Sequence, residues 1–247
     1  MNLDKRLEAL HGQGFVLIPA VLDHVQIDCL RQAIDGLEPL HWDYQGLLEQ
    51  YKCVFNRHPL WLPFLDLAPL IDLAEACLGP DCHIIGQTAW RSHPGYPGMD
   101  LHLDHLPMQL PDWVWARADF QLPMQILTAH LYLTDIDDAI GPTLVIPGSH
   151  RAGRAPLPGE TAWQSEVAAA VLCRAGDVLM FRSDLWHAGG PNRSDHGRDM
   201  LQVHYGRRMV AQKFAPYLAW HFNPRVIDAA TPRQRRLLGD HAESEYD

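Results

Sequence analysis

Three consecutive residues, His102-Leu103-Asp104, carry the side chains with the clearest potential for chemistry in this chain. In an extended segment, residues two apart project from the same face, so His102 and Asp104 can bind one metal ion. His187, much later in the chain, offers a second imidazole. Two imidazoles and one carboxylate form the facial triad of non-haem Fe(II) oxygenases, which leaves coordination positions open for O2 and an oxidisable acid. We therefore expect His102, Asp104 and His187 to be the metal ligands and the catalytic centre.

An arginine that could bind an acidic cosubstrate follows the second histidine. Arg198 lies 11 positions after His187. Its planar, permanently charged guanidinium can hold a carboxylate through two parallel hydrogen bonds, which a lysine cannot do. We expect Arg198 to bind the end of a dicarboxylate that is remote from the metal.

The pattern His-x-Asp/Glu alone is a weak signal, because it occurs at two other places in a chain with 15 histidines. His41-Trp42-Asp43 follows Glu38-Pro39 between helical patterns. His241-Ala242-Glu243 lies in a polar tail with no histidine after it. The segment at His102, by contrast, lies between strand-like stretches and has His187 and Arg198 downstream, so it is the favoured metal site.

Length and composition limit the possible classes of protein and partner. A chain of 247 residues that is 47% hydrophobic can bury a large core, so residues 1–247 are expected to form a single domain. The net charge of −10 makes nucleic acid and anionic membrane surfaces poor partners, which leaves a small-molecule substrate. The sequence carries no signal for oligomeric state.

Cysteine usage and the N-terminal residues indicate a cytoplasmic protein. The five cysteines are scattered and include no C-x-x-C pair, so free thiols are expected rather than disulfides or a zinc site. The first residues lack the apolar core of a signal peptide, and no apolar run approaches the length of a membrane span.

The order of periodic segments indicates an α+β protein. Helical spacing of leucines and isoleucines precedes residue 79, with Asp23 as a possible helix cap, and Thr231-Pro232 resembles another helix start. From residue 83 onward the period changes to two, with turn signals between the short strands. This order predicts a double-stranded β-helix, a jelly-roll or cupin-like barrel, flanked by helices that are mainly N-terminal. The expected helices are 3–10, 27–37 and 67–78, and the expected strands are 15–18, 83–91, 127–134, 143–146, 178–181 and 200–205.

Strand alternation predicts which side chains face the cavity. In the strand near residue 130, Thr128, His130 and Tyr132 form a polar face, which we assign to the cavity; solvent is the alternative. Gln202 and His204 share a face with Arg198 and should lie near the cosubstrate. Gln87 and Arg91 share another face and are candidates for substrate or cosubstrate contacts. The expected cosubstrate-binding residues are Arg198, His130, Gln87, Thr128 and Gln202.

The stretch 105–124 contains proline, tryptophan and methionine and is long for a connector, so it is expected to be a lid over the site. Trp113, Trp115 and Arg117 are its candidate contact residues. His105 is expected to point away from the metal, and His150 to bond backbone in a turn.

The residues quoted so far resemble the phytanoyl-CoA dioxygenase (PhyH-like) family of Fe(II)/2-oxoglutarate-dependent oxygenases. The resemblance extends from about residue 12 to about residue 240, and its most specific parts are the G-P-x-x-x-I-P-G-S-H stretch and the spacing between His187 and Arg198. It rests on Gly14-Phe15-Val16-Leu17-Ile18, Leu78-Gly79-Pro80, His102-x-Asp104, Gly141-Pro142 through Ser149-His150, Gly176-Asp177 through Phe181, His187-x-Gly189, Asn192-x-Ser194 and Arg198.

The resemblance implies that His102, Asp104 and His187 hold Fe(II) and that Arg198 holds 2-oxoglutarate, with O2 as the oxidant. Halogenating relatives replace the carboxylate ligand, so the presence of Asp104 favours hydroxylation. Many relatives have tryptophan at the position of His130, which is expected to take over its contact with 2-oxoglutarate by a hydrogen bond. Lys52 is the nearest counterpart of a lysine that helps to hold the cosubstrate in some members.

These features together predict a hydroxylase that acts on an unactivated C–H bond of a small metabolite, an amino acid or a natural-product intermediate, and releases succinate and CO2. Two alternatives remain open. A metal-dependent hydrolase could use the same His/Asp/His site to activate water, without O2 and without an arginine at the cosubstrate position. A catalytically idle binding barrel would keep the fold, but would usually lose one of the ligands.

Overall fold

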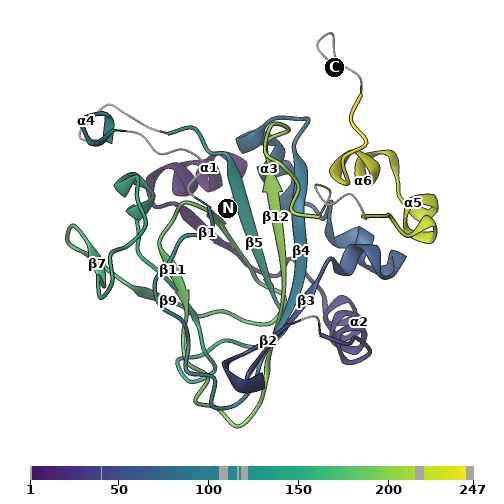
Figure 1. Cartoon of the computed structure of the whole chain (residues 1–247), viewed down its shortest axis with the longest axis horizontal. Helices are drawn as coiled ribbons and strands as arrows, with labels where there is room; N and C mark the ends of the chain where they lie inside the picture. The colour runs from purple at the N-terminus through teal and green to yellow at the C-terminus, as the bar shows by residue number, and fades with distance from the viewer. Residues whose placement is uncertain are drawn as a thin grey trace.

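Two antiparallel sheets enclose the inside of the fold (Figure 1). The computed structural model describes residues 2–39, 41–105, 111–115, 117, 122–214 and 220–242. Side chains of both sheets, including Val145, Phe181 and Met200, pack together in one apolar cluster. The large sheet has the order β1-β10-β5-β12-β4-β3-β2, and the small sheet has the order β11-β6-β9. This arrangement is the jelly-roll architecture expected from the sequence.

The strands of the two sheets include those expected from the sequence and several short ones that were not expected. In the large sheet they are β1 (Phe15–Ile18), β2 (His41–Asp43), β3 (Leu48–Lys52), β4 (His83–Ser92), β5 (Ile126–Tyr132), β10 (Val178–Arg182) and β12 (Arg198–Gly206). In the small sheet they are β6 (Thr143–Val145), β9 (Ala169–Val171) and β11 (His187–Gly189), and the hairpin β7 (Ala162–Trp163) and β8 (Glu166–Val167) stands apart.

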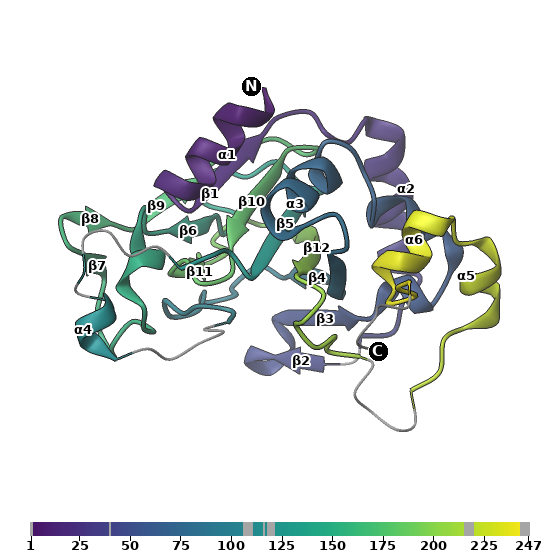
Figure 2. The same cartoon turned by 90° about the horizontal axis from the view of Figure 1, so that it is seen from above.

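Helices cover the outer face of the large sheet, as the view from above shows (Figure 2). Asp23 and Gln26 form a reciprocal capping box at the start of one of these helices, and Thr231 and Gln234 do the same near the C-terminus. The α-helices are α1 (Leu3–Gly12), α2 (His24–Asp35), α3 (Leu70–Leu78), α4 (Asp112–Trp115), α5 (Pro224–Ala229) and α6 (Pro232–Leu237). The 3-10 helices are η1 (Tyr44–Gly46), η2 (Val54–Asn56), η3 (Pro59–Phe64) and η4 (Ser149–Ala152).

Alternation in the central strands separates the helix-packed core from the inside of the barrel. Leu127, Ala129 and Leu131 of β5 belong to the core beneath the helices, together with Leu201 and Val203 of β12. The residues between them point into the barrel, and all residues of β5 and β12 are buried. The polar faces expected to point into the cavity, those with His130 on β5 and with Arg198 and Gln202 on β12, are therefore the inner faces.

Two expectations about local structure were wrong. Residues 102–104 are not a strand: His102 makes an isolated bridge with His187, and a bend follows at Asp104. His41 lies in the short strand β2, between α2 and η1. The inner face of β4 carries Thr88 and Trp90, because the register pairs Thr88 with Gln202 and Trp90 with Met200; the sequence reading had favoured the opposite face with Gln87 and Arg91.

The five cysteines are free thiols, as expected. Among the residues that the structure describes, no helix has the length and apolar character needed to cross a bilayer.

Candidate functional site

Three potential metal ligands converge at the edge of the small sheet. The ligand atoms of His102, Asp104 and His187 all lie within 4.8 Å of one another, and no other such cluster is found in the described part of the chain. The ring centroids of the two histidines are 4.4 Å apart, and Nε2 of His187 is 3.7 Å from Oδ1 of Asp104. The donor set, two imidazoles and a carboxylate, is the one expected from the sequence.

The backbone orients both imidazoles for metal binding. Nδ1 of His102 is 2.9 Å from the carbonyl oxygen of Asp100, and Nδ1 of His187 is 2.9 Å from that of Leu185. A carbonyl oxygen only accepts hydrogen bonds, so Nδ1 carries the proton in both rings. The Nε2 lone pairs are then free for a metal ion, an arrangement that metal-binding histidines commonly show. The residues present therefore fit a divalent metal.

The third potential ligand, Asp104, is supported by Thr128, which lies behind it. The Thr128 hydroxyl lies 3.4 Å from Oδ2 of Asp104, 2.7 Å from the Ser183 hydroxyl and 2.9 Å from Nδ1 of His204. The backbone N–H of Asp104 also donates to the carbonyl of Ser183 at 3.0 Å. Burial opposes ionisation of Asp104, but the nearby His187 and His204 outweigh it and lower the pKa of the carboxyl below its usual value.

The histidines around this centre favour the neutral form. Burial is the main cause that lowers the pKa of His187 and His130, and it lowers the pKa of His204 to about 3 and that of His105 to about 4. Neutral imidazoles can act as metal ligands or as hydrogen-bond acceptors near pH 7.

Arg198 begins β12 and lies at the other end of the inner face. Its side chain is buried and donates a hydrogen bond to the carbonyl oxygen of Gly141, while its Nε has no partner among the described residues. An unpartnered buried donor at one end of a cavity fits a carboxylate acceptor, because unmet buried polar groups are costly.

Close backbone packing explains the glycines in this region. The N–H of Gly190 donates to the carbonyl of Pro142 at 2.7 Å. A Cβ atom on Gly141 would lie 2.8 Å from the carbonyl oxygen of Gly190, and Gly141 also has a φ of +78°. These glycines let the two backbones meet next to Arg198.

His130 and Gln202 lie on the inner face of the large sheet, between the potential metal site and Arg198. On β12, His204 lies beside Thr128 at the metal end, and Arg198 is six residues away at the other end. Gln202 pairs with His130 between these two ends. A dicarboxylate that reaches from the metal to Arg198 would therefore pass this pair.

A hydrogen-bonded chain fixes the tautomer of His130. Nε1 of Trp90 lies 3.1 Å from Oε1 of Gln202, and Nε2 of Gln202 lies 3.0 Å from Nε2 of His130. The indole N–H can only donate, so Oε1 of Gln202 accepts and its amide nitrogen donates to His130. His130 then carries its proton on Nδ1, a buried atom without a described partner. The sequence reading missed Trp90, although its position on the same face as Thr88 could have marked it.

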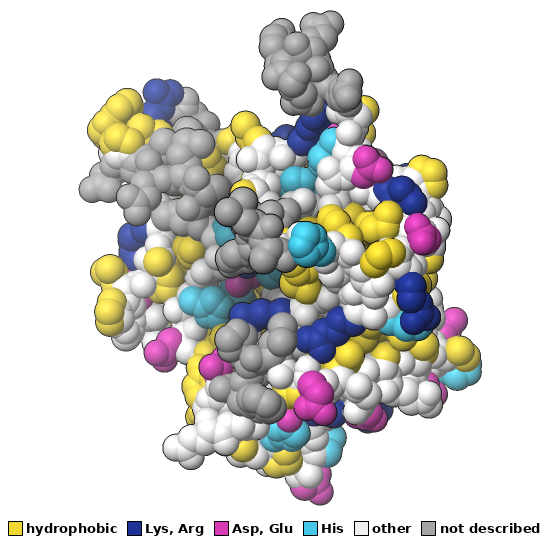
Figure 3. All heavy atoms as spheres, turned by 45° about the vertical axis from the view of Figure 1, so that its right-hand side comes forward, with side chains coloured by type: hydrophobic (Ala, Val, Ile, Leu, Met, Phe, Trp, Pro, Cys, Tyr) yellow, Lys and Arg dark blue, Asp and Glu magenta, His cyan; other side chains and the backbone are white. Residues whose placement is uncertain are grey.

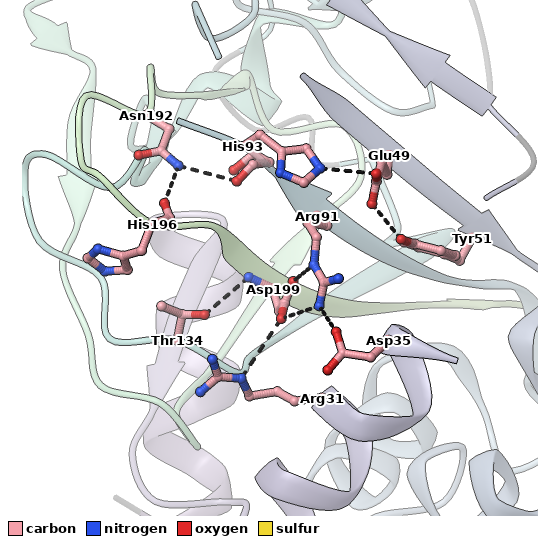
Figure 4. Close-up of polar contacts among 11 residues, drawn as sticks. Arg31, Asp35, Glu49, Tyr51, Arg91, His93, Thr134, Asn192, His196 and Asp199 are labelled. Atoms are coloured by element: carbon pink, nitrogen blue, oxygen red, sulfur yellow. Dashed lines mark hydrogen bonds and ion pairs between the residues drawn. The ribbon is translucent and has the colours of Figure 1, made fainter. Parts of the chain in front are cut away.

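The outer face of the same strands is tied together by an ionic network (Figure 4). Arg91 donates to both carboxylate oxygens of Asp199, at 2.7 and 2.9 Å, and to Asp35 of α2 at 2.7 Å. Arg31 lies 3.9 Å from Asp199. Arg91 is therefore an outer structural residue next to Arg198 and not the substrate contact that the sequence suggested.

The turn before Arg198 is held by Asn192, whose side-chain amide donates to the carbonyls of Ser92 and His196 at 3.2 and 2.9 Å (Figure 4). These bonds join the end of β4 to the start of β12. They fix the backbone from which the guanidinium of Arg198 projects.

A cavity of about 910 Å³ is lined by the three potential metal ligands and by Arg198, His130 and Gln202. Gln87 borders it, although its register partner Val203 belongs to the helix-packed core. Thr128 does not line the cavity, so the structure gives it a place behind Asp104 rather than a direct contact with a cosubstrate.

Other expectations have mixed outcomes. His105 lines the cavity, with its ring centroid 5.9 Å from that of His204, and the expectation that it points away was wrong because a bend replaces the assumed strand. Half of the expected lid, residues 106–110, 116 and 118–121, lies outside the described residues. Trp113, Trp115 and Arg117 do not line the cavity. His150 lies in η4, also outside the cavity lining.

Comparison with known proteins gives a curated relative and solved structures of similar fold. Dioxygenase trt7 of Aspergillus terreus is 29% identical over 198 residues, which cover 77% of this chain and 61% of that protein. The chain thus spans less than two thirds of the length of this relative.

Two solved structures share the fold. The epimerase SnoN from nogalamycin biosynthesis, in complex with Fe3+, alpha ketoglutarate and nogalamycin RO, has a TM-score of 0.67 at 18% identity and covers 83% of this chain and 84% of its own. HygX from Streptomyces hygroscopicus, with nickel, 2-oxoglutarate and hygromycin B bound, has a TM-score of 0.67 at 18% identity and covers 88% of this chain and 95% of its own.

The family model described as Phytanoyl-CoA dioxygenase (PhyH) matches residues 10–200, a stretch that contains the three clustered metal ligands and Arg198. The chain therefore belongs to the phytanoyl-CoA dioxygenase family of enzymes, which depend on iron, 2-oxoglutarate and O2.

Proposed function

We propose that this enzyme hydroxylates an unactivated C–H bond of a small metabolite, such as an amino acid or a natural-product intermediate, and converts 2-oxoglutarate to succinate and CO2. The main support for this proposal is that His102, Asp104, His187 and Arg198 line one cavity. The same fold also occurs in an epimerase. Asp104 is present as a carboxylate ligand, which favours hydroxylation over halogenation.

The residues of the candidate site have separate roles in this proposal. His102, Asp104 and His187 hold Fe(II), and Thr128 holds Asp104 in place through its hydroxyl. Arg198 binds the distal carboxylate of 2-oxoglutarate. When bound, the metal and 2-oxoglutarate supply the oxidising chemistry, and the protein supplies placement and exclusion of water.

His130 and Gln202 orient the cosubstrate along the inner face. His130 offers an Nδ1–H donor to an oxygen of 2-oxoglutarate, and Gln202 keeps that proton on Nδ1. Gln87 borders the cavity with both amide atoms unpartnered among the described residues, so it is a further candidate contact. The buried position of Arg198 excludes water from the carboxylate that it binds, which strengthens their ion pair.

A metal-dependent hydrolase is the main competing function. Such an enzyme needs three ligands and an activated water, but it needs no buried cation along the cavity. Arg198, buried with an unpartnered Nε, therefore favours the oxygenase.

An anaerobic titration tests the proposal. Fe(II) and 2-oxoglutarate together should give a weak metal-to-ligand charge-transfer band in the visible, and O2 should then release succinate in amounts that rise with the true substrate. The panel should include amino acids, acyl thioesters and secondary metabolites. Absence of the band, with tight zinc binding and turnover that does not require O2, would favour the hydrolase.

A further inference from the structure

Two of the three lysines in the chain face the same cavity. Lys5, Lys52 and Lys213 are the only lysines among 20 basic residues. All three side chains are exposed, but only Lys52 and Lys213 line the cavity that contains the metal ligands, whereas Lys5 lies on α1. Lysine provides a compact, mobile point charge, which distinguishes these two positions from the arginines elsewhere on the fold.

The position of Lys52 separates it from the cosubstrate anchor. Lys52 pairs with Thr88, and Arg198 pairs with Ser92 on the same strand. These rows are four residues apart, or about 13 Å at roughly 3.3 Å per residue. The backbone of Lys52 is therefore well removed from the row that contains Arg198.

Lys213 approaches the metal end of the cavity from the segment after β12. Its backbone N–H donates to the carbonyl of Ile85 at 2.9 Å, which anchors the segment beside β4. Burial is the main cause that lowers the pKa of Lys213, with a further contribution from Lys52 and an opposing one from Asp104. The charge of Lys213 also contributes to the lowered pKa of His105.

The charges of these lysines are not balanced by the cavity wall. Among the lining residues that the structure describes, Asp104 is the only acid, and it is one of the three clustered ligands. Within the described chain, neither lysine side chain forms a hydrogen bond or an ion pair. On the face of the molecule drawn in Figure 3, side chains of the Lys and Arg class lie beside histidines near the middle. A pair of like charges without a counter-ion favours the binding of an anion.

Apolar and aromatic side chains also line this cavity, beside polar ones such as Gln50 and Gln212. Phe214 and Trp220 line it with ring centroids 5.3 Å apart, and Trp90, Leu48 and Met200 line it as well. Such a wall would cover the apolar body of a ligand while the lysines bind its charged end.

We propose that Lys52 and Lys213 bind the carboxylate of the substrate, and that the substrate is a small carboxylic acid with an aromatic or alicyclic body. This inference rests on the proposed function, because 2-oxoglutarate must occupy the site at Arg198 at the same time. It narrows the substrate class to organic acids and excludes cationic metabolites.

A matched set of probes tests the proposal on the full chain loaded with Zn(II) and saturated with 2-oxoglutarate. The probes are 3-phenylpropanoate, 3-phenylpropanamide and 3-phenylpropylamine, which share a ring and differ in charge. We expect the acid to bind roughly tenfold more tightly than the amide, as a charge-assisted hydrogen bond would give. The amine should not bind.

Lysine side-chain NMR locates the bound acid. Protein labelled with 15N at the lysine Nζ atoms has three side-chain signals, because there are three lysines. The acid should shift the signals of Lys52 and Lys213 and leave that of Lys5 unchanged. Lys52→Met and Lys213→Met should each reduce the preference for the acid over the amide, and Lys213→Glu should favour the amine. Lys5→Met, which removes the same charge elsewhere, is the control.

The possible results separate this proposal from the proposed function. If 2-oxoglutarate binds normally but the acid leaves Lys52 and Lys213 unshifted, or the three probes bind alike, the lysine site is wrong and the oxygenase remains. If 2-oxoglutarate alone shifts and saturates both lysine signals, they hold the cosubstrate and the proposal is overturned. If 2-oxoglutarate does not bind at all, the proposed function fails first.

Discussion

His102 and His187 are joined by a single antiparallel bridge in which each backbone N–H donates to the carbonyl of the other residue, at 2.9 and 2.8 Å. Two side chains that are far apart in the sequence are therefore neighbours because of their backbones. Their Nδ1 atoms are also engaged by carbonyls. The two imidazoles that we propose as ligands are thus positioned by main-chain hydrogen bonds, and we expect the third proposed ligand, Asp104, to be the one that depends on side-chain support.

Thr128→Val tests this support. The substitution keeps the shape of the side chain but removes the hydroxyl beside Asp104. Loss of a group that orients a ligand typically lowers metal affinity by about 10–100-fold, and we expect a change in this range. Thr128→Ser should restore the affinity. Competition titration with Zn(II) and a chelator measures it, and Thr143→Val, a cavity residue bonded to Tyr132, is the control. Equal affinities in all four proteins would show that the hydroxyl has no such role.

Arg198→Lys tests the cosubstrate anchor. Lysine keeps the charge but loses the two-pronged geometry, so binding of 2-oxoglutarate should weaken by about 2 kcal/mol. Metal affinity should not change. Calorimetry with the Zn(II)-loaded protein measures both. The short keto acid 2-oxobutyrate has no distal carboxylate and should bind the wild-type protein and the variant equally. A variant that binds 2-oxoglutarate as tightly as the wild type would rule out this anchor.

Local signals explain what the sequence could predict. The capping boxes at Asp23 and Thr231 involve residues three positions apart, so they are readable from the letters. The inner faces of β5 and β12 were predicted correctly because polar and apolar residues alternate in both strands. His187 and Arg198 were associated with the metal motif by their types and spacing, and the structure places them around one cavity.

The errors arise where long-range contacts decide the structure. Both faces of β4 are covered, so polarity could not show that Thr88 and Trp90 share the inner face. The extended shape at His102 depends on a partner, His187, that is distant in the chain. The β3 strand contains charged and amide residues, and its pairing with β4 gives Lys52 its place in the cavity. Lys213 reaches that cavity only because the chain returns past Ile85.

Gln202→Glu should invert the tautomer of His130. A carboxylate can only accept hydrogen bonds, so it would still accept from Trp90 but would require a proton on Nε2 of His130. Nδ1 would then lack the proton that we propose is donated to 2-oxoglutarate. We expect binding of 2-oxoglutarate to weaken by roughly 1 kcal/mol or more. Side-chain 15N NMR of the Zn(II)-loaded protein reports the tautomer, with His130→Gln to assign the signals. A proton that stays on Nδ1 in the variant would contradict the hydrogen-bonded chain.

Buried histidines should make the metal-free protein acid-sensitive. Burial is the main cause that lowers the pKa of His150 to about 4, and an unfolded histidine has a pKa near 6.5. Between these values the unfolded chain binds more protons than the folded one. The contribution of the buried neutral histidine to the free energy of unfolding is therefore complete above about pH 6.5 and falls as the pH drops. Each such histidine contributes about 1.4 kcal/mol per pH unit in this window.

His150→Leu isolates one of these contributions away from the metal ligands. His150 is buried beside Gly14 and does not line the cavity, so the substitution leaves the ligands in place. Between about pH 6.5 and pH 5, the free energy of unfolding of the variant should fall less steeply than that of the wild type, by about 1.4 kcal/mol per pH unit. Urea unfolding of the chelator-treated proteins at several pH values measures both slopes. Because the comparison is between slopes, a uniform loss of stability in the variant does not affect it. Parallel curves would mean that His150 is already protonated in the folded protein or exchanges protons equally in both states.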